Sequence, residues 1–248
     1  MTFGGQGRGL VFVGGCPRSG TTLVQLMLDS HPDVCGGPEF DRVPDIVALR
    51  DRLRASVDSG RISVYRSKED VDREIGQLVE RLLAPYAGER GCKVVSEKTP
   101  WNVLIFRELS EIFPEARFIF CVRDPRAVVA SMLRVGDRAK EKGLSSPGHT
   151  RSLYSAIETV KKTNDAGFRA ADGSDRVLTV VYERLVGDPE RETARVCAFL
   201  GLPWSAEMVK PGEKRHDGEK TLDGVWYTDD MYYSNPDSLA ACTSGETS

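Results

Sequence analysis

The sequence predicts an α/β fold in which a parallel β-sheet has helices packed on both faces. Short apolar runs alternate along the chain with segments whose apolar residues recur at helical spacing. These runs are continuously apolar, as in strands that are buried on both faces of a sheet. A glycine-rich loop also separates the first apolar run from the first helical segment, where a phosphate-binding loop lies in such folds. We therefore predict a single domain of the P-loop α/β type.

The strands are predicted where Val, Ile and Phe gather in short runs. They are residues 10–13, 93–96, 117–122 and 176–182. The helices are predicted where apolar side chains lie three or four positions apart. They are residues 21–30, 43–53, 67–82, 101–113, 125–132, 151–170 and 188–200. Ser67 and Asp70 form a capping-box pattern at the start of the third helix. Residues 136–150, with mixed charges, two glycines close to a proline and no periodicity, are predicted to be a mobile loop.

The composition fits one globular domain. The chain has 248 residues, 40% of them hydrophobic, and a net charge of −3. Because periodicity is lost after Pro211, we predict a domain over residues 8–210 and an irregular segment over residues 211–248. No apolar run approaches the ~18 residues of a membrane helix, and no signal peptide is visible, so we expect no membrane association. The slightly acidic balance argues against nucleic-acid binding.

The cysteines predict no metal site. None of the six forms a Cys-x-x-Cys pair, and none clusters with histidine at zinc-ligand spacing. Cys92, Cys121 and Cys197 lie in apolar contexts and are predicted to be small core residues. We expect a reducing cytoplasmic location, although the spacing alone leaves disulfides open.

The loop over residues 14–22 is predicted to bind phosphate, since its backbone N–H groups and the following helix N-terminus can cradle an anion. Gly15 and Gly20 have the separation of the nucleotide-triphosphatase pattern, but Thr21 replaces its lysine and Arg18 supplies a cation earlier. The alternative is an ordinary glycine turn. The predicted ligand contacts are Arg18, Ser19, Gly20, Thr21 and Thr22.

A second pair of candidate phosphate ligands follows the most apolar strand. Arg123 leaves the carboxyl end of that strand, and Ser131 lies eight residues later on the next helix. The planar guanidinium of arginine suits phosphate oxygens. Taken alone, an Arg-Asp sequence such as residues 123–124 is more often a surface salt bridge.

Together these segments resemble the two cofactor-binding motifs of the sulfotransferase superfamily, whose co-substrate is 3′-phosphoadenosine-5′-phosphosulfate (PAPS). The similarity runs from about residue 10 to residue 204. The resemblance implies that residues 17–22 hold the 5′-phosphosulfate and that Arg123 and Ser131 hold the 3′-phosphate. It also places Tyr182, in the Val-Tyr-Glu-Arg-Leu segment, near the adenine.

Residues 17–34 are similar to the first motif of the tyrosylprotein sulfotransferases and their bacterial relatives. This resemblance implies that Glu39 is the general base and Lys98 a catalytic lysine, while Arg18 and Lys98 neutralise the leaving group. Glu97 is the runner-up for the base, and His31 is predicted instead to end the first helix. The tyrosylprotein enzymes carry arginines two and six positions after their glutamate, where this chain has Asp41 and Asp45.

The predicted function is transfer of a sulfuryl group from PAPS to an acceptor hydroxyl on a protein tyrosine, a small molecule or a carbohydrate. The predicted partner is the acceptor substrate. The sequence leaves the oligomeric state open, with a homodimer among the alternatives. The rival enzyme class is a P-loop nucleotide kinase, which would want lysine in place of Thr21 and a carboxylate for Mg²⁺. The rival without catalysis is an inactive nucleotide-binding protein.

Overall fold

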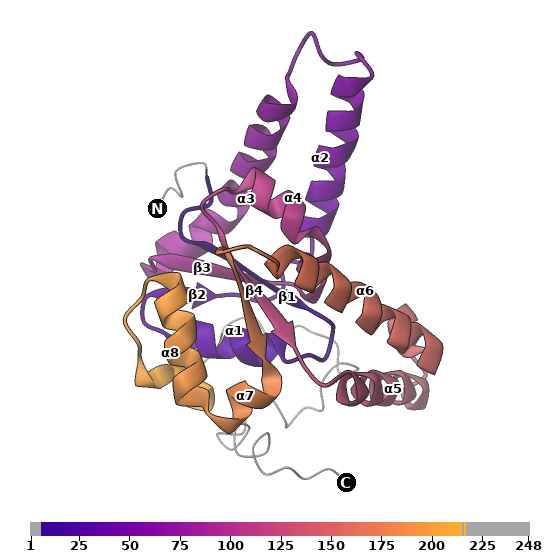
Figure 1. Cartoon of the computed structure of the whole chain (residues 1–248), viewed down its shortest axis with the longest axis vertical. Coiled ribbons are helices and arrows are strands. Elements are labelled where there is room, and N and C mark those ends of the chain that lie inside the picture. Colours follow the sequence, from indigo (N-terminus) through magenta and orange to yellow (C-terminus); the bar gives the residue numbers. More distant parts are fainter. Residues whose placement is uncertain (1–5, 215, 217–248) are drawn as a thin grey trace.

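A five-stranded parallel sheet forms the centre of the computed structural model, which describes residues 6–214 and 216 (Figure 1). The strand order is β2-β3-β1-β4-β5. The strands are β1 (Leu10–Gly15), β2 (Val34–Gly36), β3 (Val94–Lys98), β4 (Arg117–Val122) and β5 (Val177–Val181). The predicted parallel sheet is confirmed, and β2 is an addition to the four predicted strands. Of the predicted irregular segment 211–248, only residues 211–214 and 216 are described.

Helices follow each strand, and most begin where the sequence predicts. They are α1 (Thr21–Ser30), α2 (Val43–Asp58), α3 (Lys68–Arg90), α4 (Phe106–Ile112), α5 (Pro125–Glu141), α6 (Leu153–Ala171), α7 (Tyr182–Gly187) and α8 (Pro189–Leu200). Short 3₁₀ turns are η1 (Pro100–Ile105), η2 (Gly148–Thr150), η3 (Ala206–Val209) and η4 (Pro211–Glu213). Ser67 and Asp70 form the predicted capping box of α3.

The predicted mobile loop over residues 136–150 is wrong in its first part, because α5 continues to Glu141. Gly136 lies inside this helix for a packing reason. A Cβ atom on Gly136 would stand 2.2 Å from the carbonyl oxygen of Thr150, so only glycine lets η2 approach α5 this closely. The glycine therefore marks a helix contact, not a flexible turn.

Alternate residues of the strands enter two separate cores, one on each face of the sheet. Leu10 and Phe12 of β1 pack in the core that includes residues of α2, α3 and α4. Val11 and Val13 pack in the core formed with α1 and α8. This alternation follows from the period of two in a strand. The predicted arrangement, with helices on both faces, is confirmed (Figure 1).

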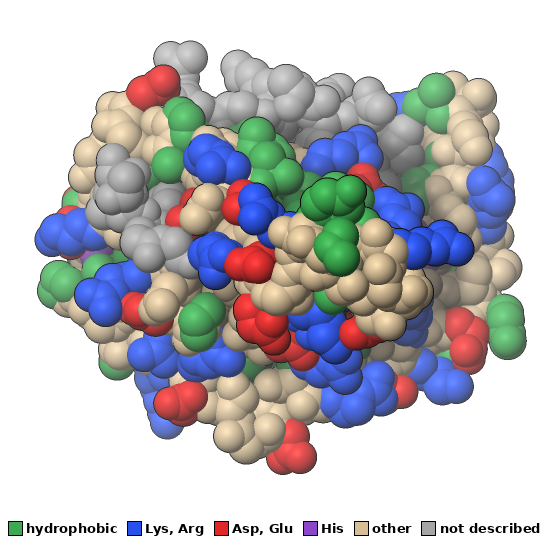
Figure 2. All heavy atoms as spheres, turned by 90° about the horizontal axis from the view of Figure 1, so that it is seen from above, with side chains coloured by type: hydrophobic (Ala, Val, Ile, Leu, Met, Phe, Trp, Pro, Cys, Tyr) green, Lys and Arg blue, Asp and Glu red, His purple; other side chains and the backbone are tan. Residues whose placement is uncertain are grey.

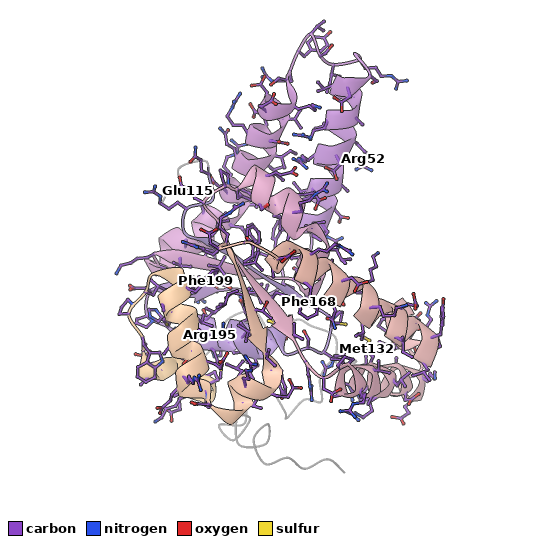
Figure 3. All side chains as sticks on the ribbon, in the orientation of Figure 1. Arg52, Glu115, Met132, Phe168, Arg195 and Phe199 are labelled. Carbon is purple, nitrogen blue, oxygen red and sulfur yellow. A yellow bond between two sulfur atoms is a disulfide. The ribbon has the colours of Figure 1, made fainter. Side chains whose placement is uncertain are left out.

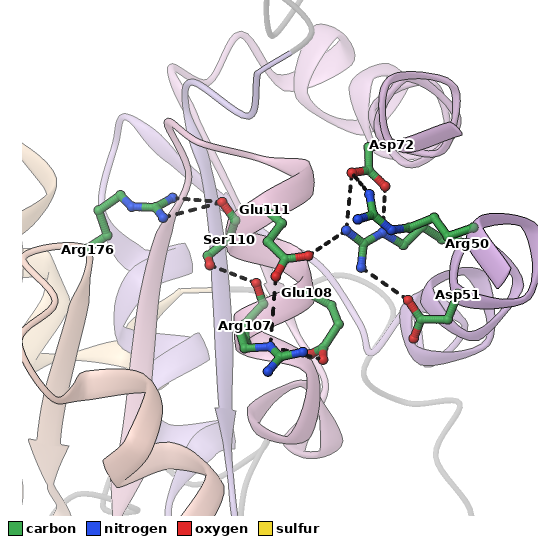
Figure 4. Close-up of polar contacts among 9 residues, drawn as sticks. Arg50, Asp51, Asp72, Arg107, Glu108, Ser110, Glu111 and Arg176 are labelled. Carbon is green, nitrogen blue, oxygen red and sulfur yellow. Dashed lines mark hydrogen bonds and ion pairs between the residues drawn. The ribbon is translucent and has the colours of Figure 1, made fainter. Parts of the chain in front are cut away.

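Helices α2 and α3 form a long hairpin that projects from the body (Figure 1). The buried guanidinium of Arg50 holds the base of this hairpin against α4 (Figure 4). Arg50 Nε lies 2.6 Å from Asp72 Oδ1 of α3, and Arg50 Nη2 lies 2.6 Å from Glu111 Oε2 of α4. A buried charge is stable only when it is paired and hydrogen-bonded, so this network fixes how α2 packs against α3 and α4.

The surface around the hairpin mixes charges of both signs. Figure 2, which looks onto the hairpin end, shows Lys and Arg interspersed with Asp and Glu side chains. Val64 and Tyr65 at the tip are 82% and 75% exposed. Within the described part of the chain, no helix has both the length and the apolar content needed to span a bilayer.

A disulfide joins Cys35, on β2, to Cys92, just after α3. The apolar context of Cys92 predicts a small core residue at this position. It is buried as expected, but it is bonded to Cys35 with a Cα–Cα distance of 5.8 Å.

Cys121 and Cys197 are buried free thiols, as predicted, and burial raises the pKa of the Cys121 thiol to about 12. The cytoplasmic location stays a prediction.

Candidate active site

The loop between β1 and α1 makes a sharp turn at the carboxyl edge of the sheet. Arg18 and Gly20 have positive φ angles of 74° and 95°, and α1 begins directly afterwards at Thr21. A Cβ atom on Gly20 would lie 2.5 Å from the Tyr182 ring, so glycine is required for this approach. The N-cap residue Gly20 contributes no side-chain cap to α1. The first N–H groups of a helix have no partner within the helix itself, so the N-terminus of α1 can face an anion.

Two polar atoms of the predicted cofactor ligands are buried without a hydrogen-bond partner among residues 6–214 and 216. They are Ser19 Oγ and Arg123 Nε. Buried polar atoms are nearly always paired in folded proteins, so orphaned ones beside a glycine-rich loop point to a missing polar ligand. The donors and their place at the helix N-terminus fit a phosphate-bearing nucleotide.

Arg123 is held in place by Tyr182 and by the loop itself. Its guanidinium carbon lies 4.2 Å from the centre of the Tyr182 ring, and Nη1 donates to the carbonyl oxygen of Arg18 over 3.4 Å. The surface salt bridge is made instead by Arg126, which pairs with Asp124 and holds the pKa of that carboxyl down, at about 2. Asp124 therefore pairs with Arg126, whereas a surface salt bridge between Arg123 and Asp124 was the alternative to phosphate binding.

The loop and α5 are also joined directly. Arg18 Nε donates to Ser131 Oγ over 3.1 Å, although the two residues are 113 positions apart. Ser131 is kept in position because α5 packs on α6 through the fully buried Met132, which Figure 3 labels. The structure therefore brings together the two segments that the sequence assigns to the two phosphate groups.

Glu39 and Lys98 form an ion pair at the same edge. Lys98 Nζ, at the end of β3, lies 2.6 Å from Glu39 Oε1 and 3.4 Å from Thr22 Oγ1 of α1. The Lys98 side chain is 2% exposed and that of Glu39 is 22% exposed. The lysine therefore bridges the phosphate-loop helix and an accessible carboxylate.

The other two candidates for the base are engaged elsewhere. Glu97 is 3% exposed and accepts a hydrogen bond of 2.7 Å from Thr99 Oγ1. Burial raises the pKa of the Glu97 carboxyl. His31 ends α1, as predicted, and its Nε2 lies 2.8 Å from the carbonyl oxygen of Pro203. Neither side chain has the exposure of Glu39.

Gln25, which was not predicted as a site residue, links α1 to the segment before Glu39. Gln25 Nε2 donates to the carbonyl oxygens of Gly37 and Ser96 over 3.1 and 3.0 Å, and Gln25 Oε1 accepts from Ser96 Oγ. The signal was a polar residue in the apolar run 23–28, where a buried amide needs partners.

Comparison with protein families matches residues 11–206 to the sulfotransferase family. The chain therefore belongs to the sulfotransferase family, a family of enzymes. It is 35% identical over 204 residues to the protein-tyrosine sulfotransferase of Drosophila melanogaster, covering 81% of this chain and 39% of that protein. It is 34% identical to protein-tyrosine sulfotransferase 1 of Danio rerio, covering 81% and 55%. The chain thus spans about half the length of these relatives, or less.

Solved structures show the same fold. The sulfotransferase domain from the curacin biosynthetic pathway superposes with a TM-score of 0.59 at 20% identity, covering 94% of this chain and 86% of that one. The sulfotransferase domain of the Synechococcus PCC 7002 olefin synthase also gives 0.59, at 23% identity, covering 96% and 88%.

Proposed function

We propose that this protein transfers a sulfuryl group from PAPS to an acceptor hydroxyl. PAPS supplies the SO₃ group and a phosphate leaving group. In such a transfer the protein mainly aligns the reactants and stabilises charge, by analogy with phosphoryl transfer. The membership of the sulfotransferase family and the phosphate-type ligand set at the carboxyl edge of the sheet support this proposal.

The observation on which the proposal rests is the ion pair between Lys98 and Glu39 beside the phosphate loop. Glu39 is the general base in our proposal, because its carboxylate is accessible and is bound by Lys98, which also contacts Thr22 of the phosphate-loop helix. Lys98 and Arg18 supply positive charge for the leaving phosphate. A base of this kind is typically worth ~10²–10⁴-fold in rate.

The remaining ligands divide between the two ends of the nucleotide. Ser19, Gly20, Thr21 and Thr22 offer N–H and hydroxyl groups to the phosphosulfate. Arg123 and Ser131 hold the 3′-phosphate, and Tyr182 lies by the adenine. The close packing of Arg123 on Tyr182 supports this division, since the cation and the ring lie against each other.

The acceptor is not expected to be strongly acidic. Asp41 and Asp45 stand where the tyrosylprotein enzymes have arginines, and both pair with Arg42, at 3.2 and 3.1 Å. The cation nearest to Glu39 in sequence is therefore already neutralised. We propose an acceptor hydroxyl on a neutral tyrosine peptide, a phenol or a carbohydrate, and we retain the cytoplasmic location and a homodimer as further predictions.

The test is an acceptor screen with radiolabelled PAPS. The purified chain is incubated with ³⁵S-PAPS and a tyrosine peptide, 2-naphthol or an oligosaccharide, and labelled product is separated. Thermal unfolding is followed in parallel with adenosine 3′,5′-bisphosphate, with ATP–Mg²⁺ and with neither. Stabilisation by ATP–Mg²⁺ alone would support the kinase, and tight bisphosphate binding without transfer to any acceptor or to water would support the inactive protein.

A further inference from the structure

The backbone that carries Glu39 is held before that residue by side chains from two helices. Asp29 of α1 accepts a hydrogen bond of 2.8 Å from the N–H of Gly36, and Tyr86 of α3 donates one of 3.0 Å to its carbonyl. Gln25 of α1 holds the carbonyl of Gly37. The helix that begins at the phosphate loop therefore also fixes the approach to Glu39.

After Glu39 the chain turns sharply. Asp41 has a φ angle of 49°, which is unusual for a residue other than glycine, and the N–H of Arg42 donates to the carbonyl of Phe40 over 2.6 Å. Such a conformation costs free energy and persists only where its surroundings enforce it. The groups that enforce it here come from the end of β3 and the turn after it.

Glu97 and Thr99 supply these contacts. The N–H of Phe40 donates to Glu97 Oε1 over 3.4 Å, and the N–H of Asp41 donates to Thr99 Oγ1 over 3.2 Å. Thr99 Oγ1 in turn donates to Glu97 Oε1, and Asn102 Nδ2 donates to Glu97 Oε2. Both carboxyl oxygens of Glu97 are thus occupied by groups that do not belong to a substrate.

We propose that Glu97 is a positioning residue that holds residues 40–41 and thereby aims the Glu39 carboxylate at the acceptor beside Lys98. This inference rests on the proposed function. It assigns Glu97 no proton transfer, in contrast to its candidacy as the base, because the side chain is 3% exposed and fully hydrogen-bonded. The raised pKa of Glu97 agrees with this role, since either protonation state can accept the Phe40 N–H.

Two substitutions separate positioning from catalysis. Glu97→Leu keeps the approximate size of the side chain but removes the acceptor for Phe40 and Thr99. Glu97→Gln retains an acceptor oxygen there. Its amide nitrogen can donate to Asn102 once that amide rotates, because Asn102 Oδ1 has no partner among the described residues. If Glu97 were the general base, kcat would fall equally in Glu97→Leu and Glu97→Gln.

The experiment combines amide hydrogen exchange with kinetics. We expect exchange at Phe40 and Asp41 to accelerate at least about tenfold in Glu97→Leu, and kcat for transfer from ³⁵S-PAPS to 2-naphthol to fall ~10²-fold, as for a misplaced catalytic group. Glu97→Gln should recover kcat to within about fivefold of the wild type, and affinity for adenosine 3′,5′-bisphosphate should stay unchanged. Glu80→Leu is the matched control, because Glu80 is a buried glutamate that holds the N–H of Gly7, away from this loop.

A double-mutant cycle tests whether Glu97 acts through Glu39. In a Glu39→Gln background, Glu97→Leu should cause no further loss of kcat, whereas a multiplicative loss would overturn the proposal. Equal inactivity of Glu97→Gln and Glu97→Leu would also overturn it and make Glu97 the base. If Glu97→Leu does not fold, Thr99→Val replaces it in the same measurements, because it removes the hydroxyl that accepts the Asp41 N–H. Should the wild type transfer sulfuryl to no acceptor, the proposed function fails, and unchanged exchange at Phe40 and Asp41 would still overturn the positioning role by itself.

Discussion

Arg18 donates a hydrogen bond to Ser131, so the loop after β1 and the helix after β4 meet in a single ligand set. The contact lies between the residues assigned to the 5′ and 3′ ends of one nucleotide. Arg123 reinforces it by donating to the carbonyl of Arg18. A ligand with phosphates at both ends would therefore engage two segments that already touch.

Adenosine 3′,5′-bisphosphate should stabilise the protein without added metal. The reason is that Arg18, Arg123 and the N-terminus of α1 supply the positive charge that Mg²⁺ provides in nucleotide triphosphatases. A ligand at ~100 times its dissociation constant adds ~2.7 kcal/mol to the free energy of unfolding. Chemical denaturation with EDTA present measures the gain. A strict requirement for Mg²⁺, or no gain at millimolar ligand, would count against the assigned site.

Arg123→Ala should discriminate between nucleotides. It should weaken binding of adenosine 3′,5′-bisphosphate by ~1.5–3 kcal/mol, the usual cost of losing a charged hydrogen-bond partner, and leave adenosine 5′-phosphosulfate nearly unaffected. Calorimetric titration of both nucleotides gives the two values. Arg126→Ala is the control, because Arg126 is 92% exposed and pairs with Asp124. Equal losses for the two nucleotides in Arg123→Ala would show that the 3′-phosphate assignment is wrong.

The stability of the wild type relative to Glu97→Gln should fall as the pH rises. Burial raises the pKa of the Glu97 carboxyl in the folded protein, whereas the unfolded chain titrates near ~4.3. Between these two pKa values the folded state binds more protons than the unfolded state, so the free energy of unfolding decreases with pH. Glutamine does not titrate. Urea unfolding of both proteins from about pH 4 to 8 measures the difference, and parallel curves would contradict the buried carboxyl.

The sequence was sufficient to predict which residues gather at the site, because parallel strands end at one edge of a sheet. Arg18 and Arg123 each follow a predicted strand, so their shared location followed from the predicted topology, whereas Lys98 was assigned from the family resemblance and lies at the end of β3. The strand β2 was not predicted, because its three residues owe their conformation to pairing with β3. The helix α7 was also missed, because Tyr182 continues the apolar pattern of β5.

No local sequence pattern predicts the residues that hold Glu39 in place. Gln25 meets Ser96 across 71 positions, and Glu97 meets Phe40 across 57. Nothing in the local spacing of either pair indicates the contact, since it depends on how β3 and α1 pack at the edge of the sheet. The disulfide between Cys35 and Cys92 likewise depends on a pairing that separation in sequence does not specify.

Glu39→Gln should leave nucleotide affinity nearly intact and lower turnover by ~10²–10⁴-fold. Glutamine keeps the size and polarity of the side chain and still accepts a hydrogen bond from Lys98, but it cannot take a proton at neutral pH. Titration with adenosine 3′,5′-bisphosphate and single-turnover transfer from ³⁵S-PAPS measure the two effects separately.

Lys98→Met provides the contrast to Glu39→Gln, because Lys98 lies between the carboxylate and the phosphate-loop helix. Its loss removes the charge next to the leaving phosphate and leaves Glu39 without its partner, so both the affinity for PAPS and the turnover should fall.

If Glu39→Gln retains wild-type turnover while Glu97→Gln loses it, the base is Glu97. If neither substitution lowers turnover, the acceptor reaches the site already deprotonated, as a phenolate does. The pH dependence of the rate, measured with a series of substituted phenols, would then distinguish this case, because without a protein base the rate rises at the pKa of each phenol and not at one pH common to the series.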